Sequence, residues 1–221
     1  MPTSANLQPA MQFLDELGQN NYKAWLDEHR LAYESAREAF YALVDDLIDE
    51  FRAPDHLQGL SAKDCTARIY RDIRFSKDKT PYKTNFAAHV TPGGWRSTRL
   101  GYYISIAPQG RSLTAGGLHS PTPEQLIRFR EAVDWDAAPL KAVLEAPDFA
   151  AAFGGIEGER LKTGPKGYNP AHPEIALLKL KEITAVHSFT DQEVLAPDFT
   201  GKVIELCRVM RPFLDYLNGI L

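Results

Sequence analysis

Apolar residues between positions 25 and 51 recur every three or four residues, the spacing of one face of an α-helix. The stripe consists of Trp25, Leu26, Tyr33, Ala36, Phe40, Leu43, Leu47 and Phe51. The preceding MQFLDELGQ predicts a shorter amphipathic helix ending near Gly18, and Asn20 or Asn21 is expected to cap the second helix. This pattern therefore predicts N-terminal helices over residues 8–52.

The pattern changes between about residues 66 and 119. NFAAHVT, LGYYISIAP and SLTAGG are short, rich in aromatic or β-branched residues and separated by PGG and PQGR turns, which predicts neighbouring antiparallel strands. ARIYRDIRFS has two interpretations. On a helix its three arginines would form one ridge, but its Ile, Tyr and Phe content favours a further strand.

A helical pattern returns at Thr122, where Gln125 stands in the capping-box position, and Thr190 with Glu193 repeats this signal. Further helices are expected around residues 136–145, 147–153 and 173–182, and a last one over about 198–217. The sequence thus predicts an α+β fold, in which a central antiparallel β-sheet (about 66–119) is flanked by N-terminal helices (8–52) and C-terminal helices (122–218). All 221 residues are expected to form a single domain.

The composition, 44% hydrophobic and 24% charged, is that of an ordinary soluble globular protein. The N-terminus lacks the pattern of a secretory signal, and no apolar run reaches the roughly 18 residues that a membrane helix needs. Cys65 and Cys207 are far apart and form no C-x-x-C pair, and the six histidines show no metal-ligand spacing. We therefore expect a cytoplasmic protein without a metal, a cofactor or a membrane partner; the sequence leaves the oligomeric state open.

Positive charge is concentrated in one segment of an acidic chain. Residues 63–83 contain seven cations and three anions, a local +4, so that the net charge of -4 leaves -8 for the remainder. A nucleic-acid-binding domain is usually basic over a whole face. The distribution therefore favours a compact anion site over an extended polyanion track, although a nucleic-acid or protein-binding module using the same cations remains an alternative.

The residue types of this segment suit a phosphate or carboxylate. Arginine offers a planar fork of donors and lysine a point charge. The expected anion-binding residues are Arg68, Arg71, Arg74, Lys77, Lys79 and Lys83, joined by Lys166 from the Gly/Pro-rich loop LKTGPKGY. If the two loops fold together, Tyr82 and Tyr168 would contact the body of the ligand.

The nearest acids, Asp72 and Asp78, can be interpreted as general bases or as partners that orient an arginine. A purely structural network between these cations and carboxylates, such as those of VDDLIDE at 44–50, is a further alternative. Neither a G-x-S-x-G elbow nor a P-loop spacing occurs in the sequence, so no residue is singled out as catalytic, and whether the protein is an enzyme stays open.

The segment RIYRDIRFSKDKTPYKTN resembles the signature block of an uncharacterised family of bacterial and fungal proteins, the domain of unknown function 2461. FLDELGQNNYKAWLDEHRLAYE, GGLHSPTPEQLIRFREAV and LKTGPKGYNPAHPEIALLKLKEI resemble other parts of the same family in the same order. The resemblance covers nearly the whole chain. It implies a shared fold and a set of marked positions, but no reaction.

Overall fold

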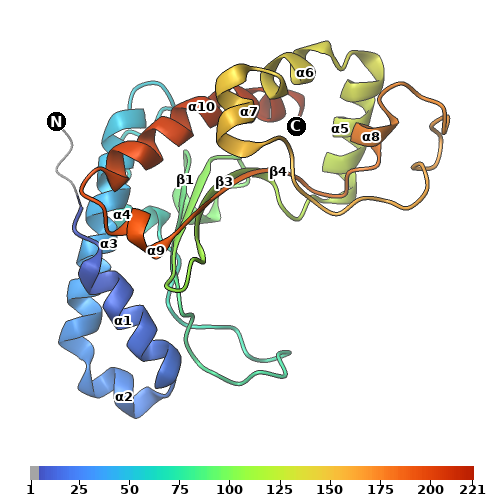
Figure 1. Cartoon of the computed structure of the whole chain (residues 1–221). Helices are drawn as coiled ribbons and strands as arrows, with labels where there is room; N and C mark the ends of the chain where they lie inside the picture. Colours follow the sequence, from blue (N-terminus) through green and yellow to red (C-terminus); the bar gives the residue numbers. More distant parts are fainter. Residues whose placement is uncertain (1–4) are drawn as a thin grey trace. The chain divides into compact units, whose positions relative to one another are not determined.

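The computed structural model describes residues 5–221, which form helices and a four-stranded antiparallel sheet and so confirm the predicted α+β class (Figure 1). The helices are α1 (Gln8–Gln19), α2 (Lys23–Glu28), α3 (Arg30–Phe51), α4 (Ala62–Cys65), α5 (Pro123–Trp135), α6 (Ala138–Leu144), α7 (Pro147–Phe153), α8 (Ile175–Leu178), α9 (Asp191–Val194), α10 (Phe199–Ile220) and the 3₁₀ turn η1 (Gly94–Arg96). The strands are β1 (Phe86–Val90), β2 (Tyr102–Ile106), β3 (Ser112–Leu118) and β4 (Ile183–Phe189), in the order β1-β2-β3-β4.

The chain divides into two compact units. The first comprises the residues up to Thr98, Tyr102–Thr114 and Ser188–Glu205, and the second comprises Arg99–Gly101, Ala115–His187 and Leu206–Leu221. The elements β3, β4 and α10 each run from one unit into the other. Compact units are not the same as independently folding domains, so the single domain expected from the sequence stays a prediction.

The long N-terminal apolar stripe is helical, but the helix is interrupted. α2 ends at Glu28 and α3 begins at Arg30, with His29 between them. The His29 ring stacks on Trp25 at 4.1 Å between ring centroids, and its Nδ1 lies 2.8 Å from the Trp25 carbonyl. The backbone hydrogen bonds from His29 N–H to the Trp25 carbonyl and from Tyr33 N–H to the His29 carbonyl are kept, so the break is a local change of the backbone angles at His29, to φ -102° and ψ 26°.

The predicted asparagine cap is wrong. The Asn20 side-chain amide donates to the Glu16 carbonyl at 3.0 Å and so closes the end of α1. α2 has no side-chain cap, because Asn21 bonds instead to the backbone of Tyr82, 61 residues further along the chain.

The sheet differs from its predicted extent at both ends. β1 pairs with β2 in the register Phe86↔Ile106 to Val90↔Tyr102. The strand expected over ARIYRDIRFS is absent: between residues 66 and 85 only the isolated bridges Thr66↔Ala88 and Tyr70↔Tyr82 form. This stretch carries charges on both faces and its opposing limb contains a proline without an N–H, so it lacks the apolar face and the donors of a regular strand. Conversely, β4 lies within the region predicted to be helical.

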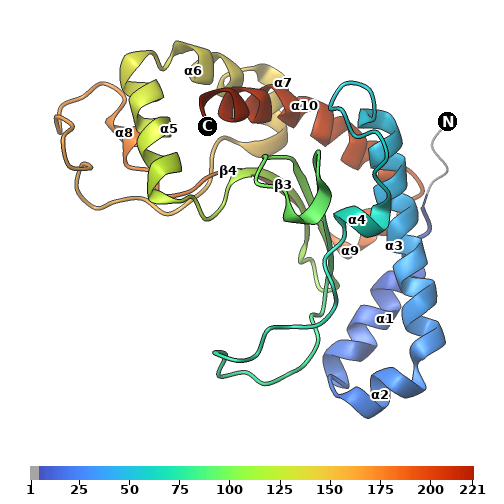
Figure 2. The same ribbon diagram turned by 180° about the vertical axis from the view of Figure 1, so that it is seen from behind.

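The core of the first unit is aromatic. Phe86 of β1 is 2% exposed and stacks near Phe13 of α1 and Phe40 of α3, at 6.3 and 5.7 Å between ring centroids. α4 lies beside α3 (Figure 2), where the Asp45 carboxylate accepts the Ala62 N–H at 2.8 Å. These contacts fix one face of α3 against the start of β1.

Residues 67–85, which we call the arm, project as a long loop from the beginning of β1 (Figure 1, teal). The arm contains most of the basic segment singled out in the sequence.

The capping boxes predicted at Thr122 and Thr190 are confirmed, at the N-termini of α5 and α9.

No helix of the described chain is long and apolar enough to cross a membrane.

Candidate anion-binding site

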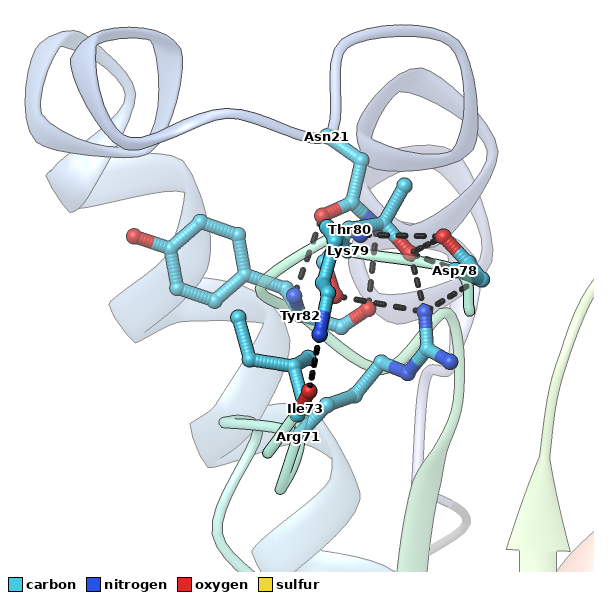
Figure 3. A network of polar contacts seen from close by, with 7 residues as sticks. All are labelled: Asn21, Arg71, Ile73, Asp78, Lys79, Thr80 and Tyr82. Carbon is cyan, nitrogen blue, oxygen red and sulfur yellow. Dashed lines mark hydrogen bonds and ion pairs between the residues drawn. The ribbon is translucent and has the colours of Figure 1, made fainter. Parts of the chain in front are cut away.

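Backbone hydrogen bonds hold the base of the arm to β1 and join its two limbs to each other. Ala67 N–H donates to the Ala87 carbonyl at 2.9 Å, and Lys83 N–H donates to the Ile69 carbonyl at 2.7 Å. Asn21 then brackets Tyr82: its amide donates to the Tyr82 carbonyl and its oxygen accepts the Tyr82 N–H, both at 3.0 Å (Figure 3). The Asn21 side chain thus supplies the donor and the acceptor that the backbone of a neighbouring strand would otherwise provide.

Nearer the tip, Arg71 is bonded within the arm itself. Its guanidinium contacts the Asp78 carboxylate at 2.5 Å, the Thr80 carbonyl at 3.2 Å and the Thr80 hydroxyl (Figure 3). The Thr80 N–H and the Arg71 guanidinium, in this order of importance, lower the pKa of Asp78 to about 2. The donors of Arg71 that face Asp78 and Thr80 are therefore occupied.

Arg74 and Lys79 are also bonded within the arm. Arg74 donates hydrogen bonds to the Asp72 carboxylate from Nε at 2.9 Å and from a terminal nitrogen at 2.6 Å, and these bonds lower the pKa of Asp72. Lys79 Nζ donates to the Ile73 carbonyl at 2.9 Å. Asp72 and Asp78 are thus bonded to Arg74 and Arg71, as partners that orient an arginine would be. Nothing in this geometry supports the other interpretation, a role as general base. Lys77 is exposed and has no ion pair within residues 5–221.

A different set of cations lines a pocket of about 250 Å³ at the base of the arm, which we call the basic pocket. The tyrosines and cations that line it are Tyr33, Arg37 and Tyr41 of α3, Lys63 of α4, and Arg68 and Tyr70 of the arm. Phe86 also lines it, so the pocket lies on the aromatic core. No carboxylate is among the lining residues.

Arg37 is held between two rings. Its guanidinium carbon lies 5.6 Å from the ring centroid of Tyr33 and 5.4 Å from that of Tyr41, within cation–π range. One terminal nitrogen donates to Glu38 at 3.2 Å, but Nε is buried and has no hydrogen-bond partner. A buried donor without an acceptor is costly.

The other two cations of the pocket are unpaired. Neither Lys63 nor Arg68 makes an ion pair or a side-chain hydrogen bond within residues 5–221. Next to them, Lys83 is half-buried, and burial together with the charge of Arg68 lowers its pKa. Its Nζ lies 5.8 Å from the Trp95 ring centroid. Positive charge therefore gathers here without compensation from carboxylates in the pocket wall.

The two tyrosines of the arm's isolated bridge differ in exposure, and only Tyr82 is expected at the site from the sequence. Tyr82, expected to contact a ligand, is 4% exposed, whereas Tyr70 is 58% exposed and lines the pocket. Their rings meet edge to face at 5.4 Å between centroids. Tyr82 therefore packs against the Tyr70 ring and is not part of the pocket lining.

Of the six tyrosines and cations that line the pocket, only Arg68 is expected at the site from the sequence. The sequence pattern assigns Tyr33 to the apolar core stripe and passes over Arg37 and Tyr41. Their spacing of four residues along one helix is the signal, because it stacks the three side chains into a single ridge.

Lys166 and Tyr168 belong to the second unit, so the shared pocket expected from the two loops stays a prediction. Lys166 is exposed, and burial followed by the charge of Asp134 raises the pKa of Tyr168.

The second unit has its own hollow of about 550 Å³, whose ionisable lining residues are Asp134, Asp136, Lys141, Glu145, His172 and Glu174. Lys141 is paired with Glu174 at 2.9 Å. His172 accepts the Glu174 N–H at Nδ1, and its Nε2 lies 3.2 Å from Asp134. Carboxylates outnumber cations in this hollow, so it does not suit an anion, and both ring nitrogens of the histidine are occupied.

Among the described residues, no group of three or more histidines, cysteines or acids is arranged to hold a metal ion.

The comparisons with known proteins agree with the resemblance seen in the sequence. A family model described as "Conserved hypothetical protein (DUF2461)" matches residues 9–216, so the chain belongs to this family. Neither a curated protein nor a solved structure matches the chain.

Proposed function

We propose that the protein binds a small phosphorylated or carboxylated molecule in the basic pocket. The observation that carries this proposal is the combination of three cations, Arg37, Lys63 and Arg68, with the absence of any lining carboxylate. An anion would supply the countercharge that Lys63 and Arg68 lack. Whether the bound molecule is also turned over is a separate question.

The cations have different roles in this proposal. Arg68 offers two parallel N–H donors to a phosphate or carboxylate, Arg37 adds positive charge from α3, and Lys63 adds a point charge on a flexible stem. Lys83 adds to the field without lining the pocket. Arg71, Arg74 and Lys79 contribute little, because none of them lines the pocket and each is bonded within the arm.

A thermal-shift titration with inorganic phosphate, pyrophosphate, citrate and nucleoside monophosphates tests the proposal. A ligand that binds only the folded state adds about 2.7 kcal/mol of stability at one hundred times its dissociation constant. We expect Arg68→Ala to reduce the shift strongly and Arg74→Ala, the matched control on the arm, to leave it unchanged. No shift with any anion, or an equal loss in both variants, contradicts the proposal.

The arm supports a second candidate, a nucleic-acid or protein-binding module. Phe75 at its tip is 95% exposed, the Arg74 guanidinium lies 5.9 Å from its ring centroid, and Lys77 is unpaired. Phosphate-driven binding to duplex DNA weakens by roughly 0.9 log units per contact for each log unit of salt. Binding that is independent of salt, or insensitive to Lys77→Glu, removes this candidate. The net charge of -8 outside residues 63–83 argues against it.

We place the protein in the cytoplasm, because Cys65 and Cys207 are both buried thiols, as suits a reducing compartment. Recovery of the protein with periplasmic or secreted fractions would contradict this assignment.

A further inference from the structure

We propose that the ligand of the basic pocket carries a planar aromatic ring next to its phosphate or carboxylate, and that this ring stacks on Tyr70. This inference rests on the proposed function and names the class of molecule that the site accepts. The described pocket pairs cations with aromatic walls, so both parts of such a ligand meet a matching surface.

The tyrosine rings of the pocket differ in whether they already pack against a cation. The rings of Tyr33 and Tyr41 already pack against the Arg37 guanidinium. Tyr70 instead leaves more than half of its surface exposed, in a pocket that is otherwise built on the core residue Phe86. An exposed ring at the edge of a concave, partly apolar site is a natural stacking surface for a second ring.

The position of Tyr70 is fixed before any ligand arrives. Lys83 N–H donates to the Ile69 carbonyl and Arg71 N–H to the Pro81 carbonyl, on either side of the Tyr70↔Tyr82 bridge. Tyr82 is in turn held by both hydrogen bonds from Asn21. A ring presented on a fixed backbone loses little entropy when it binds, which favours a stacking role over a passive surface position.

The size of the pocket limits the ligand. Its volume of about 250 Å³ lies just below the roughly 300–1,000 Å³ of pockets that enclose drug-sized molecules. One ring and one anionic group fit this space, whereas a dinucleotide or a long acyl carrier does not. Phenyl phosphate is therefore the simplest probe of the class, and a nucleoside monophosphate is near the upper limit.

Isothermal titration calorimetry with three probes tests the inference. Inorganic phosphate reports the cations alone, cyclohexyl phosphate adds a ring-sized apolar group, and phenyl phosphate adds the same bulk as a planar ring. Aromatic pairs contribute about 0.5–1.5 kcal/mol beyond buried area, so we expect phenyl phosphate to bind roughly twofold to tenfold more tightly than cyclohexyl phosphate.

Variants separate this inference from the proposed function. Tyr70→Leu should abolish the preference for phenyl phosphate and leave the affinity for inorganic phosphate unchanged, while Tyr70→Phe should retain the preference. Tyr22→Leu, a substitution at a half-exposed tyrosine outside the pocket lining, is the matched control and should change neither. Equal affinities of the two organic phosphates overturn the ring preference alone. Failure of all three phosphates to bind, together with no thermal shift from citrate or the other anions, overturns the proposed function, and this inference with it.

Discussion

The arm and the basic pocket contain cations from the same short stretch of sequence, yet the two regions differ in whether these cations are paired with acids. On the arm, Arg71 and Arg74 each bind an aspartate only a few residues away. In the pocket, Arg68 has no acid within reach, and the other cations come from α3 and α4. The two arginines of the arm are therefore neutralised locally, whereas Lys63 and Arg68 of the pocket stay unpaired within residues 5–221.

This difference shows how a cluster of like charges in a sequence separates in the folded chain. The acids Asp72 and Asp78 are close enough along the chain to turn back onto the neighbouring arginines, so the tip of the arm neutralises much of its own charge. Arg68 precedes both acids and lies next to the body of the first unit, where its neighbours are Lys83 and aromatic rings. The available cations are therefore at the base of the basic segment and not at its centre.

The largest expected contrast concerns the aromatic residues of the two regions. Phe86→Ala removes a ring that is 2% exposed beneath the pocket and should lower the free energy of unfolding by about 3–5 kcal/mol. Phe75→Ala removes a ring that is 95% exposed on the arm and should change the stability by less than about 0.5 kcal/mol. Urea unfolding of both variants measures the contrast, and comparable losses would mean that the arm tip packs on the protein.

A smaller effect is expected where the two regions meet. Asn21→Ala removes both hydrogen bonds to the Tyr82 backbone and should lower the free energy of unfolding by about 1–3 kcal/mol. Amide hydrogen exchange should accelerate between residues 69 and 83 and remain unchanged in the middle of α3. Gln19→Ala, an exposed substitution nearby, is the control. Unaltered exchange in the arm would show that Asn21 does not hold it.

A crossed pair of arginine substitutions tests whether the two regions have separate roles. Arg71→Met removes three contacts in a partly exposed setting, so it should lower the stability by about 1 kcal/mol and leave phosphate affinity unchanged. Arg37→Met removes one of the three cations of the pocket wall and should weaken phosphate binding by about tenfold, since a hydrogen bond to a charged group contributes roughly 1.5–3 kcal/mol. Titration calorimetry and urea unfolding on both variants provide the two readouts. Loss of phosphate binding in the Arg71 variant would merge the two regions into one site.

The smallest effect is a change of the arm with pH. The pKa of Asp78 is about 2, below the value of about 3.9 in an unfolded chain, so its contribution is complete above about pH 4. As the pH falls from about 4 toward 2, protonation should release Arg71 and the Thr80 N–H, while the pocket has no lining carboxylate to titrate. The NMR shift of the Thr80 amide measures this transition. It should be lost in Asp78→Asn, and its persistence there would assign it to another group.

Much of the fold follows from local patterns. The capping boxes at Thr122 and Thr190, the apolar stripe of α3 and the first three strands are visible in the sequence, because helix spacing, caps and turns involve residues only a few positions apart. β4 was missed because ITAVHSF is a strand only by virtue of its neighbour β3, which lies far away along the chain. The same cause explains Asn21, a good capping residue that instead meets a backbone 61 residues away.

By itself, the sequence determined the α+β class, the family and the presence of a basic segment in an acidic chain. Only the tertiary structure decided which cations in that segment are paired, because Arg71 and Arg74 reach nearby aspartates whereas Arg68 is brought to α3 by the bonds at the base of the arm. Only the tertiary structure joined Tyr33, Arg37 and Tyr41 to Arg68 and Tyr70 in one pocket. Charge is counted along a chain, but whether it is neutralised depends on distances of a few ångströms, which folding sets.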